Sequence, residues 1–380
     1  MSAASAGLPS ITFVSPYAQA GGSERYLGQL LDGIAPARIK GVVYLQEGPA
    51  VDEQRGRRDV TVIPTSPRLP AIVDAARRLR RLLAADRPDL VHANGVKAAL
   101  VAVLATLGTG IPVVWVKHDL SFDRSLARPL ALGCRLVVGV SETAVRVFRG
   151  PLRRRVRIVP NALPPVEADR AASRRAVLER LDAPAHAPVI ALIGRLYPMK
   201  GQHELMEVLP ELVREVPDVR VVFVGQDDPS EAAYAAALRR RADELRLGAS
   251  LRFLGRVERG ADFAAGCDLV VTPSVPAERG NTESFSLVAL EAMWVGTPVI
   301  GYAEGGLPEV VGPCGLLVPT GDRRSLLQAL VRALRDDDLR ARLASCGRER
   351  AATRFRVEQM LAGLEACYGE AARASRRRWP

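Results

Sequence analysis

The chain has 380 residues, 48% of them hydrophobic and 25% charged, and its formal net charge is +11. This length is too great for one ordinary core and predicts two domains of globular composition. The sequence has neither a run of the roughly 18 apolar residues that a membrane helix needs nor a basic leader followed by an apolar stretch. These features argue against a membrane-spanning or exported class and predict a cytoplasmic protein, at most peripheral to a membrane.

The cysteines and the charge distribution narrow the class further. Five cysteines without C-x-x-C spacing predict reduced thiols, with neither a disulfide framework nor a zinc site. Residues 1–165 hold 23 Lys and Arg against 12 Asp and Glu, whereas residues 166–380 hold 30 of each. We expect the first half to attract a phosphorylated acceptor, an anionic membrane surface or an acidic protein, and no nucleic acid. A generally arginine-rich composition would give the same excess without a partner.

Strands and helices alternate through the first half, which is typical of a parallel sheet with helices on both faces. We predict strands at residues 11–15, 41–45, 60–63, 90–92, 112–117 and 136–140 and helices at 25–34, 71–84 and 98–107. Ligands of such sheets bind beyond the carboxyl ends of the strands. The candidate site residues are therefore the polar residues that follow the strands, namely Ser15, His92, Asn94, His118, Asp119, Ser141 and Glu142.

Two positions of this half stand out. Gly21 and Gly22 precede a helix, where backbone can approach a ligand closely, although a plain tight turn fits equally well and the dinucleotide fingerprint does not. His118 ends an apolar strand and could donate to a sugar hydroxyl or carry a proton; a structural histidine is the alternative. His92 would pair with backbone or line an acceptor site.

Residues 71–84 form an amphipathic pattern with four arginines opposite its apolar side, at positions 77, 78, 80 and 81. Such a helix can contact an anionic membrane or an acidic protein, or it can present a solvated face.

A proline-rich segment near residue 165 marks a crossing between domains, and the same alternation begins again at residue 189. We predict domains at 1–165 and 166–358, with a helix at 359–380 returning to the first domain. The second run of strands covers residues 189–193, 220–224, 251–253, 268–272 and 298–301.

Two segments of the second half carry candidate ligand-binding residues. Arg195 and Lys200 lie between a strand and a helix, where two cations can hold a diphosphate. Glu283 and Glu291 flank the start of a helix at about residue 286, which favours a phosphate, while the carboxylates can accept hydrogen bonds from sugar and ribose hydroxyls. Alternatively, Glu283 is a helix-capping acid and Glu291 is a solvated surface residue.

Together these segments resemble the retaining glycosyltransferases of family 4, whose α/β GT-B fold has two Rossmann-like lobes with parallel sheets facing across a cleft. The resemblance spans nearly the whole chain. It rests on GGSE at 21–24, KHD at 117–119, VPNAL at 159–163, GRLYPMKG at 194–201, VFVG at 222–225, LRFLGRV at 251–257 and ESFSLVALEAMWVGTPVIGYAEGGLPEVV at 283–311. The last segment matches the Glu-x7-Glu signature of that family.

The resemblance implies roles for the matching positions. Catalysis would fall to His118, Arg195, Lys200 and Glu283. The donor would contact Gly22, Gly194, Arg195, Lys200, Gly225, Phe253, Leu254, Arg256, Glu283, Ser284, Phe285, Ser286, Leu287 and Glu291. The acceptor would contact Gly21, Gly22, His92, Asn94 and Asp119. No metal and no cofactor are implied beyond the nucleotide sugar itself, because cations and helix dipoles take their place.

Three departures from the family pattern bear on these roles. Ser286 stands where a glycine is usual, Ala162 follows Asn161 where a glycine is usual, and the loop at 276–281 carries extra residues. The first places a side chain where a glycine would let the amides approach a phosphate closely.

We therefore predict a retaining glycosyltransferase that moves a hexose or N-acetylhexosamine from a UDP sugar, such as UDP-GlcNAc. The acceptor would be a secondary-metabolite scaffold, free or on an acidic carrier protein, or alternatively an anionic lipid or cell-surface glycan precursor. A UDP-sugar epimerase with the same fold and a non-catalytic sensor are the competing functions.

Overall fold

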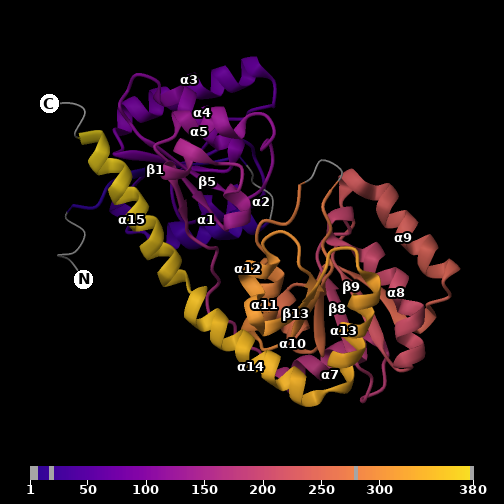
Figure 1. Ribbon diagram of the computed structural model, residues 1–380. Coiled ribbons are helices and arrows are strands. Elements are labelled where there is room, and N and C mark those ends of the chain that lie inside the picture. Colours follow the sequence, from indigo (N-terminus) through magenta and orange to yellow (C-terminus); the bar gives the residue numbers. More distant parts are fainter. Residues whose placement is uncertain (1–6, 17–20, 278–280, 377–380) are drawn as a thin grey trace. The chain divides into compact units, whose positions relative to one another are not determined.

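The computed structural model describes residues 7–16, 21–277 and 281–376. These residues fold as two compact units (Figure 1). Unit 1 is formed by the described residues up to Ala162 together with those from Val357 onward, and unit 2 is Leu163–Arg356. The two units are thus divided after residues 162 and 356. The predicted divisions lay slightly later, after residues 165 and 358.

The described part of unit 1 contains one parallel sheet of seven strands in the order β3-β2-β1-β4-β5-β6-β7. Its strands are β1 (Ile11–Ser15), β2 (Ile39–Tyr44), β3 (Val60–Val62), β4 (Leu90–Asn94), β5 (Val113–Lys117), β6 (Leu136–Gly139) and β7 (Val156–Ile158). After β1, the chain adds β2 and β3 on one side of β1. The next strand, β4, pairs with β1 on the opposite side. Open α/β sheets bind ligands beyond the carboxyl ends of their strands at such a reversal of direction, which here lies between β1 and β4.

Helices cover both faces of this sheet (Figure 1). They are α1 (Gly22–Gly33), α2 (Pro49–Arg55), α3 (Leu69–Asp86), α4 (Val96–Thr106), α5 (Ala127–Gly133), α6 (Glu142–Val145) and α15 (Val357–Arg376). One apolar core joins the sheet to α3, α4 and α5. The other face is covered by α15, which packs on β4, β5 and β6 and beside α1. The last helix therefore completes unit 1 rather than unit 2.

The described part of unit 2 has a parallel sheet of six strands in the order β10-β9-β8-β11-β12-β13. Its strands are β8 (Val189–Ile193), β9 (Arg220–Val224), β10 (Leu251–Gly255), β11 (Leu269–Thr272), β12 (Val299–Tyr302) and β13 (Gly315–Val318). The same reversal occurs here between β8 and β11. Most strand residues are buried on both faces, which explains their continuous apolar runs.

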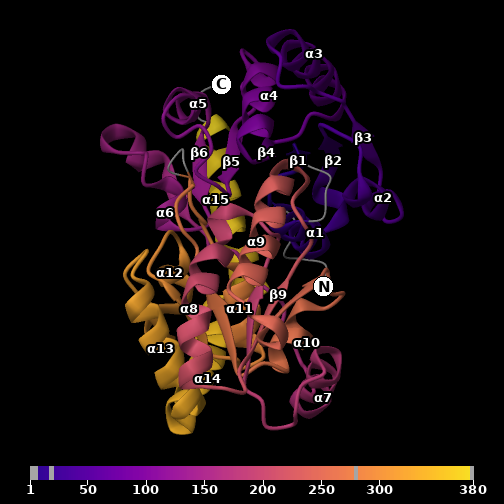
Figure 2. The same ribbon diagram turned by 90° about the vertical axis from the view of Figure 1, so that its right-hand side faces the viewer.

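Helices cover both faces of the unit 2 sheet as well (Figure 2). The helices are α7 (Arg170–Leu181), α8 (Gln202–Glu215), α9 (Ala232–Glu244), α10 (Gly260–Ala265), α11 (Leu287–Trp294), α12 (Leu307–Val311), α13 (Arg323–Arg335) and α14 (Asp337–Arg354). One core packs α8, α9 and α13 on the sheet, and the other packs α7 and α10 on its opposite face. Within the described residues, no helix is both long enough and apolar enough to span a bilayer.

The structure corrects the prediction that all thiols are reduced. Cys314 and Cys346 form a disulfide with their Cα atoms 5.2 Å apart, while Cys134, Cys267 and Cys367 are buried and unbridged. The two bridged residues lie 32 positions apart, in the short turn η6 (Gly312–Cys314) and in α14. Such a pairing depends on tertiary structure, so the spacing of the cysteines could not reveal it.

Candidate functional site

The reversal of direction in unit 2 brings two loops together at the carboxyl edge of its sheet. Gly194 follows β8 directly, and Ser274 follows β11, which pairs with β8. Gly194 has φ +154°, and Gly201, at the start of α8, has φ +70°. A Cβ atom on Gly201 would lie 1.8 Å from the carbonyl oxygen of Pro273, so only glycine lets the two loops approach so closely.

Lys200 and Glu283 meet at this edge. The Lys200 Nζ atom lies 2.7 Å from the Glu283 Oε1 atom, and the other carboxylate oxygen accepts a hydrogen bond of 2.9 Å from the Ser274 hydroxyl. The Glu283 side chain is 11% exposed and the Lys200 side chain 24%. The pair is therefore held in a fixed geometry yet open to a ligand.

Two glycines press against the backbone next to Glu283. Gly305 has φ +59°, and a Cβ there would lie 2.1 Å from the Glu283 carbonyl oxygen. A Cβ on Gly306 would lie 1.9 Å from the Ser284 carbonyl oxygen, and the Gly306 amide donates to the Glu283 carbonyl at 2.8 Å. The glycine pair thus fixes the chain that leads into α11.

The start of α11 is capped by its own side chain. Ser286 is fully buried, and its hydroxyl accepts a hydrogen bond of 3.4 Å from the Ala289 amide. Phe285 is 8% exposed and packs edge-on against Phe355, with the ring centroids 5.8 Å apart. The predicted helix start at residue 286 becomes a cap at Ser286 and a first helical residue at Leu287.

Arg195 lies on the loop after Gly194 and is turned to an acid that the sequence analysis did not single out. Its guanidinium lies 2.6 Å from the Asp228 carboxylate, which is nearly buried, whereas the Arg195 side chain is 65% exposed. Burial alone would raise the pKa of Asp228, but two hydrogen bonds from Ser230 and the Arg195 charge together lower it. Asp228 therefore anchors Arg195 as a carboxylate.

The remaining candidate donor residues also belong to unit 2. Glu291 is partly buried on α11, and a Cβ on Gly260 would come within 3.5 Å of its Oε2 atom. Gly225 has φ +152°, and its amide donates to the Gly255 carbonyl at 2.7 Å. On the edge strand β10, Phe253 packs under the Arg239 guanidinium, which lies 5.3 Å from the ring centroid. Leu254 is partly buried, and Arg256 is exposed.

In unit 1, a hydrogen-bonded pair lies at the carboxyl edge of the sheet, where β4 and β5 end. The His118 Nε2 atom lies 2.5 Å from Asn94 Oδ1, and Asn94 Nδ2 donates to the Ser23 carbonyl oxygen at 3.3 Å. The Tyr26 ring packs edge-on against His118, with the centroids 4.7 Å apart. Burial lowers the pKa of His118 to about 4, and the nearby Asp119 opposes this shift. His118 is therefore neutral near pH 7.

Two predicted acceptor ligands are buried in the structure. His92 is fully buried, and its Nδ1 atom lies 2.7 Å from the Tyr368 hydroxyl of α15, so it presents no surface to an acceptor. Burial lowers the pKa of His92 to about 3. Asn94 is also fully buried and contacts His118 instead of solvent. Neither residue could be recognised as internal from a strand end alone.

The other acceptor candidates lie near the surface of unit 1. Asp119 is partly buried, and its carboxylate accepts a 2.8 Å hydrogen bond from the Ser121 amide. Gly21 and Gly22 are exposed at the start of α1, which begins three residues earlier than predicted. In the extended loop at 276–281, residues 278–280 lie outside the described residues.

Sequence reasoning missed Asp228, Ser274 and Tyr26. Asp228 and Ser274 each lie a few residues beyond the carboxyl end of a strand, so the rule that selected His118 could have selected them as well. Tyr26 faces inward from α1 and carries no comparable signal. No group of three or more metal-binding side chains occurs in the part of the chain that the structure describes.

Comparison with known proteins identifies the family. A model described as "Glycosyl transferases group 1" matches residues 173–350, and one described as "Glycosyltransferase Family 4" matches residues 20–166. A D-inositol 3-phosphate glycosyltransferase of Saccharomonospora viridis is 32% identical over 315 residues, which are 76% of this chain and 71% of that relative. Another protein of that name, from Salinispora arenicola, is 31% identical over 77% of this chain and 70% of its own length.

Solved structures show the same fold. Anabaena Alr3699/HepE in complex with UDP and glucose matches with a TM-score of 0.79 at 23% identity, over 94% of this chain and 99% of that one. Sucrose-phosphate synthase of Thermosynechococcus elongatus matches with a TM-score of 0.73 at 22% identity, over 96% and 100% of the two chains.

The chain belongs to the family 4 glycosyltransferases and has the GT-B fold of two Rossmann-like α/β units. It is accordingly a retaining glycosyltransferase that takes its sugar from a nucleotide sugar, as the sequence predicted. The family assignment sets aside the epimerase and the non-catalytic sensor.

Proposed function

We propose that this enzyme transfers a hexose or N-acetylhexosamine from a UDP sugar, UDP-GlcNAc foremost, to a hydroxyl or amine of a small acidic acceptor. The observation that carries the proposal is the cluster of Lys200, Glu283 and Ser274 at the carboxyl edge of the unit 2 sheet, beside the glycine pair at 305 and 306. The UDP complex of HepE and the names of the inositol phosphate relatives support this donor and this kind of acceptor.

In the proposed donor complex, Lys200 and Arg195 hold the diphosphate, and the amides at the start of α11 face its distal phosphate. Before the donor arrives, Glu283 keeps Lys200 at the site, and a diphosphate competes for that cation because it bears more charge. Glu283 then accepts hydrogen bonds from sugar hydroxyls. Glu291 takes the ribose hydroxyls, and the end of β10, from Phe253 to Arg256, borders the base.

The proposed reaction breaks the bond between the sugar C1 atom and the diphosphate oxygen through an oxocarbenium-like transition state. The acceptor oxygen bonds to C1 on the same face, and its proton passes to an oxygen of the leaving phosphate. No protein nucleophile is needed. Lys200, Arg195 and the α11 start stabilise the leaving charge, and one such group typically contributes roughly 3–4 kcal/mol to lowering the barrier. His118, neutral near pH 7, contacts the transferred sugar.

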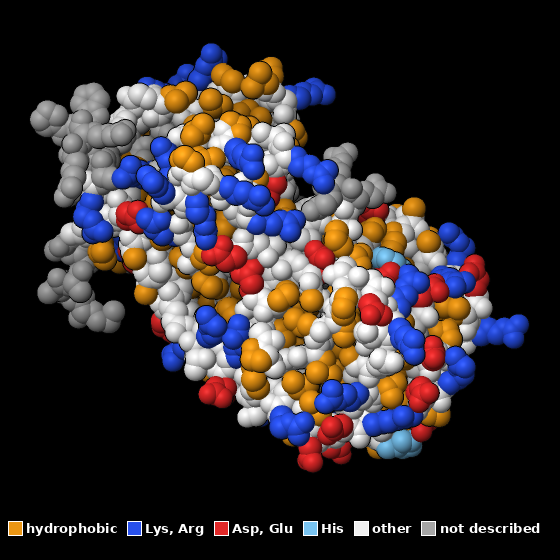
Figure 3. All heavy atoms as spheres, viewed as in Figure 1, with side chains coloured by type: hydrophobic (Ala, Val, Ile, Leu, Met, Phe, Trp, Pro, Cys, Tyr) orange, Lys and Arg blue, Asp and Glu red, His pale blue; other side chains and the backbone are white. Residues whose placement is uncertain are grey.

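For the acceptor, the charge distribution is the guide. Figure 3 shows Lys and Arg side chains gathered over unit 1 in this view, whereas acidic and basic side chains alternate over unit 2. A basic surface favours an anionic acceptor. We therefore propose a phosphorylated or carboxylated polyol first. A secondary-metabolite scaffold, a carrier-bound one and an anionic lipid form the other arms of the acceptor panel, and a cytoplasmic location is part of the proposal.

The test measures release of UDP or GDP from UDP-GlcNAc, UDP-glucose and GDP-mannose, with D-myo-inositol 3-phosphate as the first acceptor. Lys200→Met should lower turnover of the preferred donor by about 100-fold or more. Arg214→Met is the matched control, because Arg214 is an exposed cation at the far end of α8 and should leave turnover unchanged. Unchanged turnover of every donor by Lys200→Met would refute the assignment of the diphosphate site.

A further inference from the structure

The loop that follows β5 contains an unusual backbone position. Within residues 7–16, 21–277 and 281–376, four non-glycine residues have positive φ: Arg87, Phe122, Asp182 and Arg246. Arg87 and Asp182 are the residues that end α3 and α7, and Arg246 follows the end of α9, where a left-handed residue is normal. Phe122, with φ +62°, ends no helix. A large side chain disfavours this conformation, so its retention there calls for an explanation.

The same residue exposes an aromatic ring. Phe122 is 57% exposed and is the aromatic member of the five large apolar residues exposed in the described part of the chain. Leu107 and Leu132, which belong to that group, precede β5 and β6 and so lie at the amino edge of the sheet. Phe122 instead follows β5 and lies at the carboxyl edge, four residues after His118.

Phe122 is held in place from both sides. Its carbonyl oxygen accepts hydrogen bonds of 3.0 Å from the amides of Ser125, Leu126 and Ala127. The adjacent Asp123 forms an ion pair of 2.7 Å with Lys117, whose side chain is only 2% exposed, and Lys117 also donates to the Asp119 carbonyl. A buried lysine therefore ties both ends of the loop to the end of β5, and the exposed ring is not the tip of a loose loop.

We propose that Phe122 is an acceptor-binding residue whose ring packs against the apolar C–H face of a ring-shaped acceptor, a pyranoside or a cyclitol. This proposal rests on the proposed function, because it takes the carboxyl edge of unit 1 as the acceptor side. Because the backbone that carries the ring is already held, a ligand that packs on the ring has less of the loop to order, and this benefit offsets the unfavourable backbone conformation. The exposed Arg124 two residues later supplies a cation for an acidic substituent on that acceptor.

The test compares Phe122→Gly with Phe122→Tyr. Glycine removes the ring and adopts φ +62° without strain, so this variant should fold at least as stably as the wild type. Tyrosine keeps the ring. Saturation-transfer NMR on the UDP-saturated enzyme measures binding of four probes: D-myo-inositol 3-phosphate, methyl α-D-glucopyranoside, methyl α-D-mannopyranoside and phenyl β-D-glucopyranoside. For at least one probe we expect Phe122→Gly to raise the Kd by about 3- to 10-fold and Phe122→Tyr to restore it.

Leu132→Ala is the control, since it removes an exposed apolar side chain from the opposite edge of the same sheet and should leave probe binding unchanged. The proposal is overturned if no probe loses affinity in Phe122→Gly, or if Phe122→Tyr is as weak as the glycine variant. UDP affinity is measured separately. Failure of the wild type to bind UDP would contradict the donor assignment, and probe binding measured without UDP would still decide the role of Phe122.

Discussion

The amide of Asn94 determines which nitrogen of His118 bears the proton. Asn94 Nδ2 donates to the Ser23 carbonyl, which can only accept, so Asn94 Oδ1 faces His118 and accepts from its Nε2–H group. The Nδ1 atom of the neutral ring is then its acceptor nitrogen. Residue type and position at a strand end singled out His118 as a candidate. They could not show that Asn94 contacts His118, because that contact depends on tertiary packing.

Replacing Asn94 with aspartate should change the pH dependence of the reaction. A carboxylate beside His118 favours the imidazolium and raises its pKa from about 4. We expect kcat/KM measured by UDP release to fall about tenfold at pH 6 relative to pH 8, whereas the wild type stays nearly constant over that range. Adding His118→Gln to the Asn94→Asp variant should abolish this pH dependence. A flat profile for Asn94→Asp would mean that the reaction does not depend on a neutral His118.

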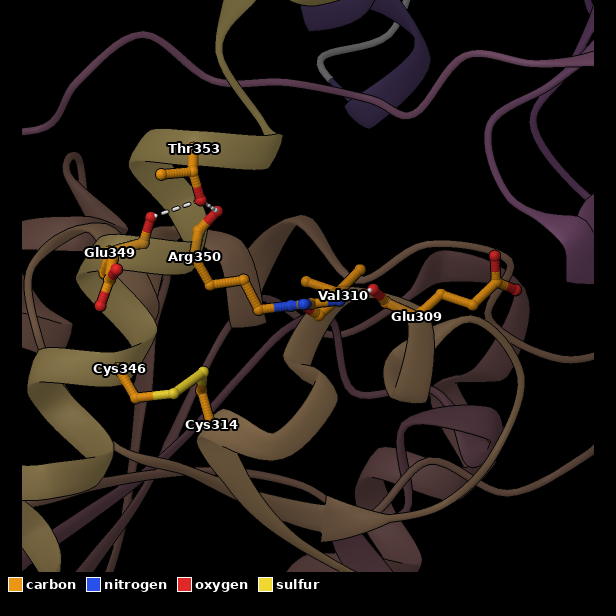
Figure 4. Close-up of a disulfide and its surroundings, with 7 residues drawn as sticks. All are labelled: Glu309, Val310, Cys314, Cys346, Glu349, Arg350 and Thr353. Atoms are coloured by element: carbon orange, nitrogen blue, oxygen red, sulfur yellow. Dashed lines mark hydrogen bonds between the residues drawn. A yellow bond between two sulfur atoms is a disulfide. The ribbon is translucent and has the colours of Figure 1, made fainter.

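Among the elements, α14 is bonded to the segment that follows Gly305 and Gly306. Figure 4 shows the disulfide from Cys346 to Cys314, and on the same side of α14 the Arg350 side chain reaches the end of α12. Arg350 donates to the carbonyl oxygens of Val310 at 2.7 Å and Glu309 at 2.8 Å, which satisfies groups that a helix end leaves unpaired. The backbone that follows Gly305 and Gly306 is thus held by α14, whose Arg350 lies 40 residues beyond Val310 in the chain.

Loss of this disulfide should destabilise unit 2. The bridge spans 32 residues, and closing a loop of that length in the unfolded chain is worth about 3–4 kcal/mol. Cys346→Ser should therefore lower the free energy of unfolding of unit 2 by about that amount in urea titration. Dithiothreitol should produce the same loss in the wild type, and the Cys314→Ser/Cys346→Ser double variant should no longer respond to it. Equal stability with and without reductant would show that the bridge contributes nothing.

The strands show which parts of the fold the sequence pattern could predict and which it could not. The strands β1, β8 and β9 are almost entirely buried and rich in apolar residues, and their predicted limits equal the observed ones. β7 and β13 were missed. β7 has only three residues and lies just before the proline-rich segment that indicated a crossing between domains, while β13 begins at a glycine and is only partly buried. Contacts such as Arg195 with Asp228 join loops 33 residues apart, and only the strand order brings them together.

Arg80 illustrates the same limit on helix α3. The predicted basic face is present, since residues 77, 78, 80 and 81 are all exposed. Arg80, however, donates to the carbonyl oxygens of Ala105 and Leu107 at the end of α4, and Arg78 pairs with Asp74. Two of the four cations therefore have intramolecular partners, so a membrane or protein contact through this helix would rest chiefly on Arg77 and Arg81.

At the scale of the whole molecule, each unit has its own core, and unit 1 is assembled from both ends of the chain. Arg38 pairs with Glu365 at 2.6 Å, and Arg157 pairs with Glu370 at the same distance, which fixes α15 to the rest of unit 1. The same helix supplies Tyr368, the partner of buried His92. Titration of His92 therefore acts on the stability of unit 1.

Acid should weaken unit 1 through this histidine. The pKa of His92 is about 3 in the folded chain against 6.5 when exposed, so the unfolded state binds more protons and stability falls as pH drops below 6.5. At pH 5 the loss relative to pH 7 is roughly 2 kcal/mol. The protection factors of amides in β4 and α15, corrected for the slower intrinsic exchange in acid, should fall accordingly, and His92→Gln should reduce that change while β8 and β9 serve as the reference. An equal fall in wild type and His92→Gln would mean that His92 does not govern the acid response of unit 1.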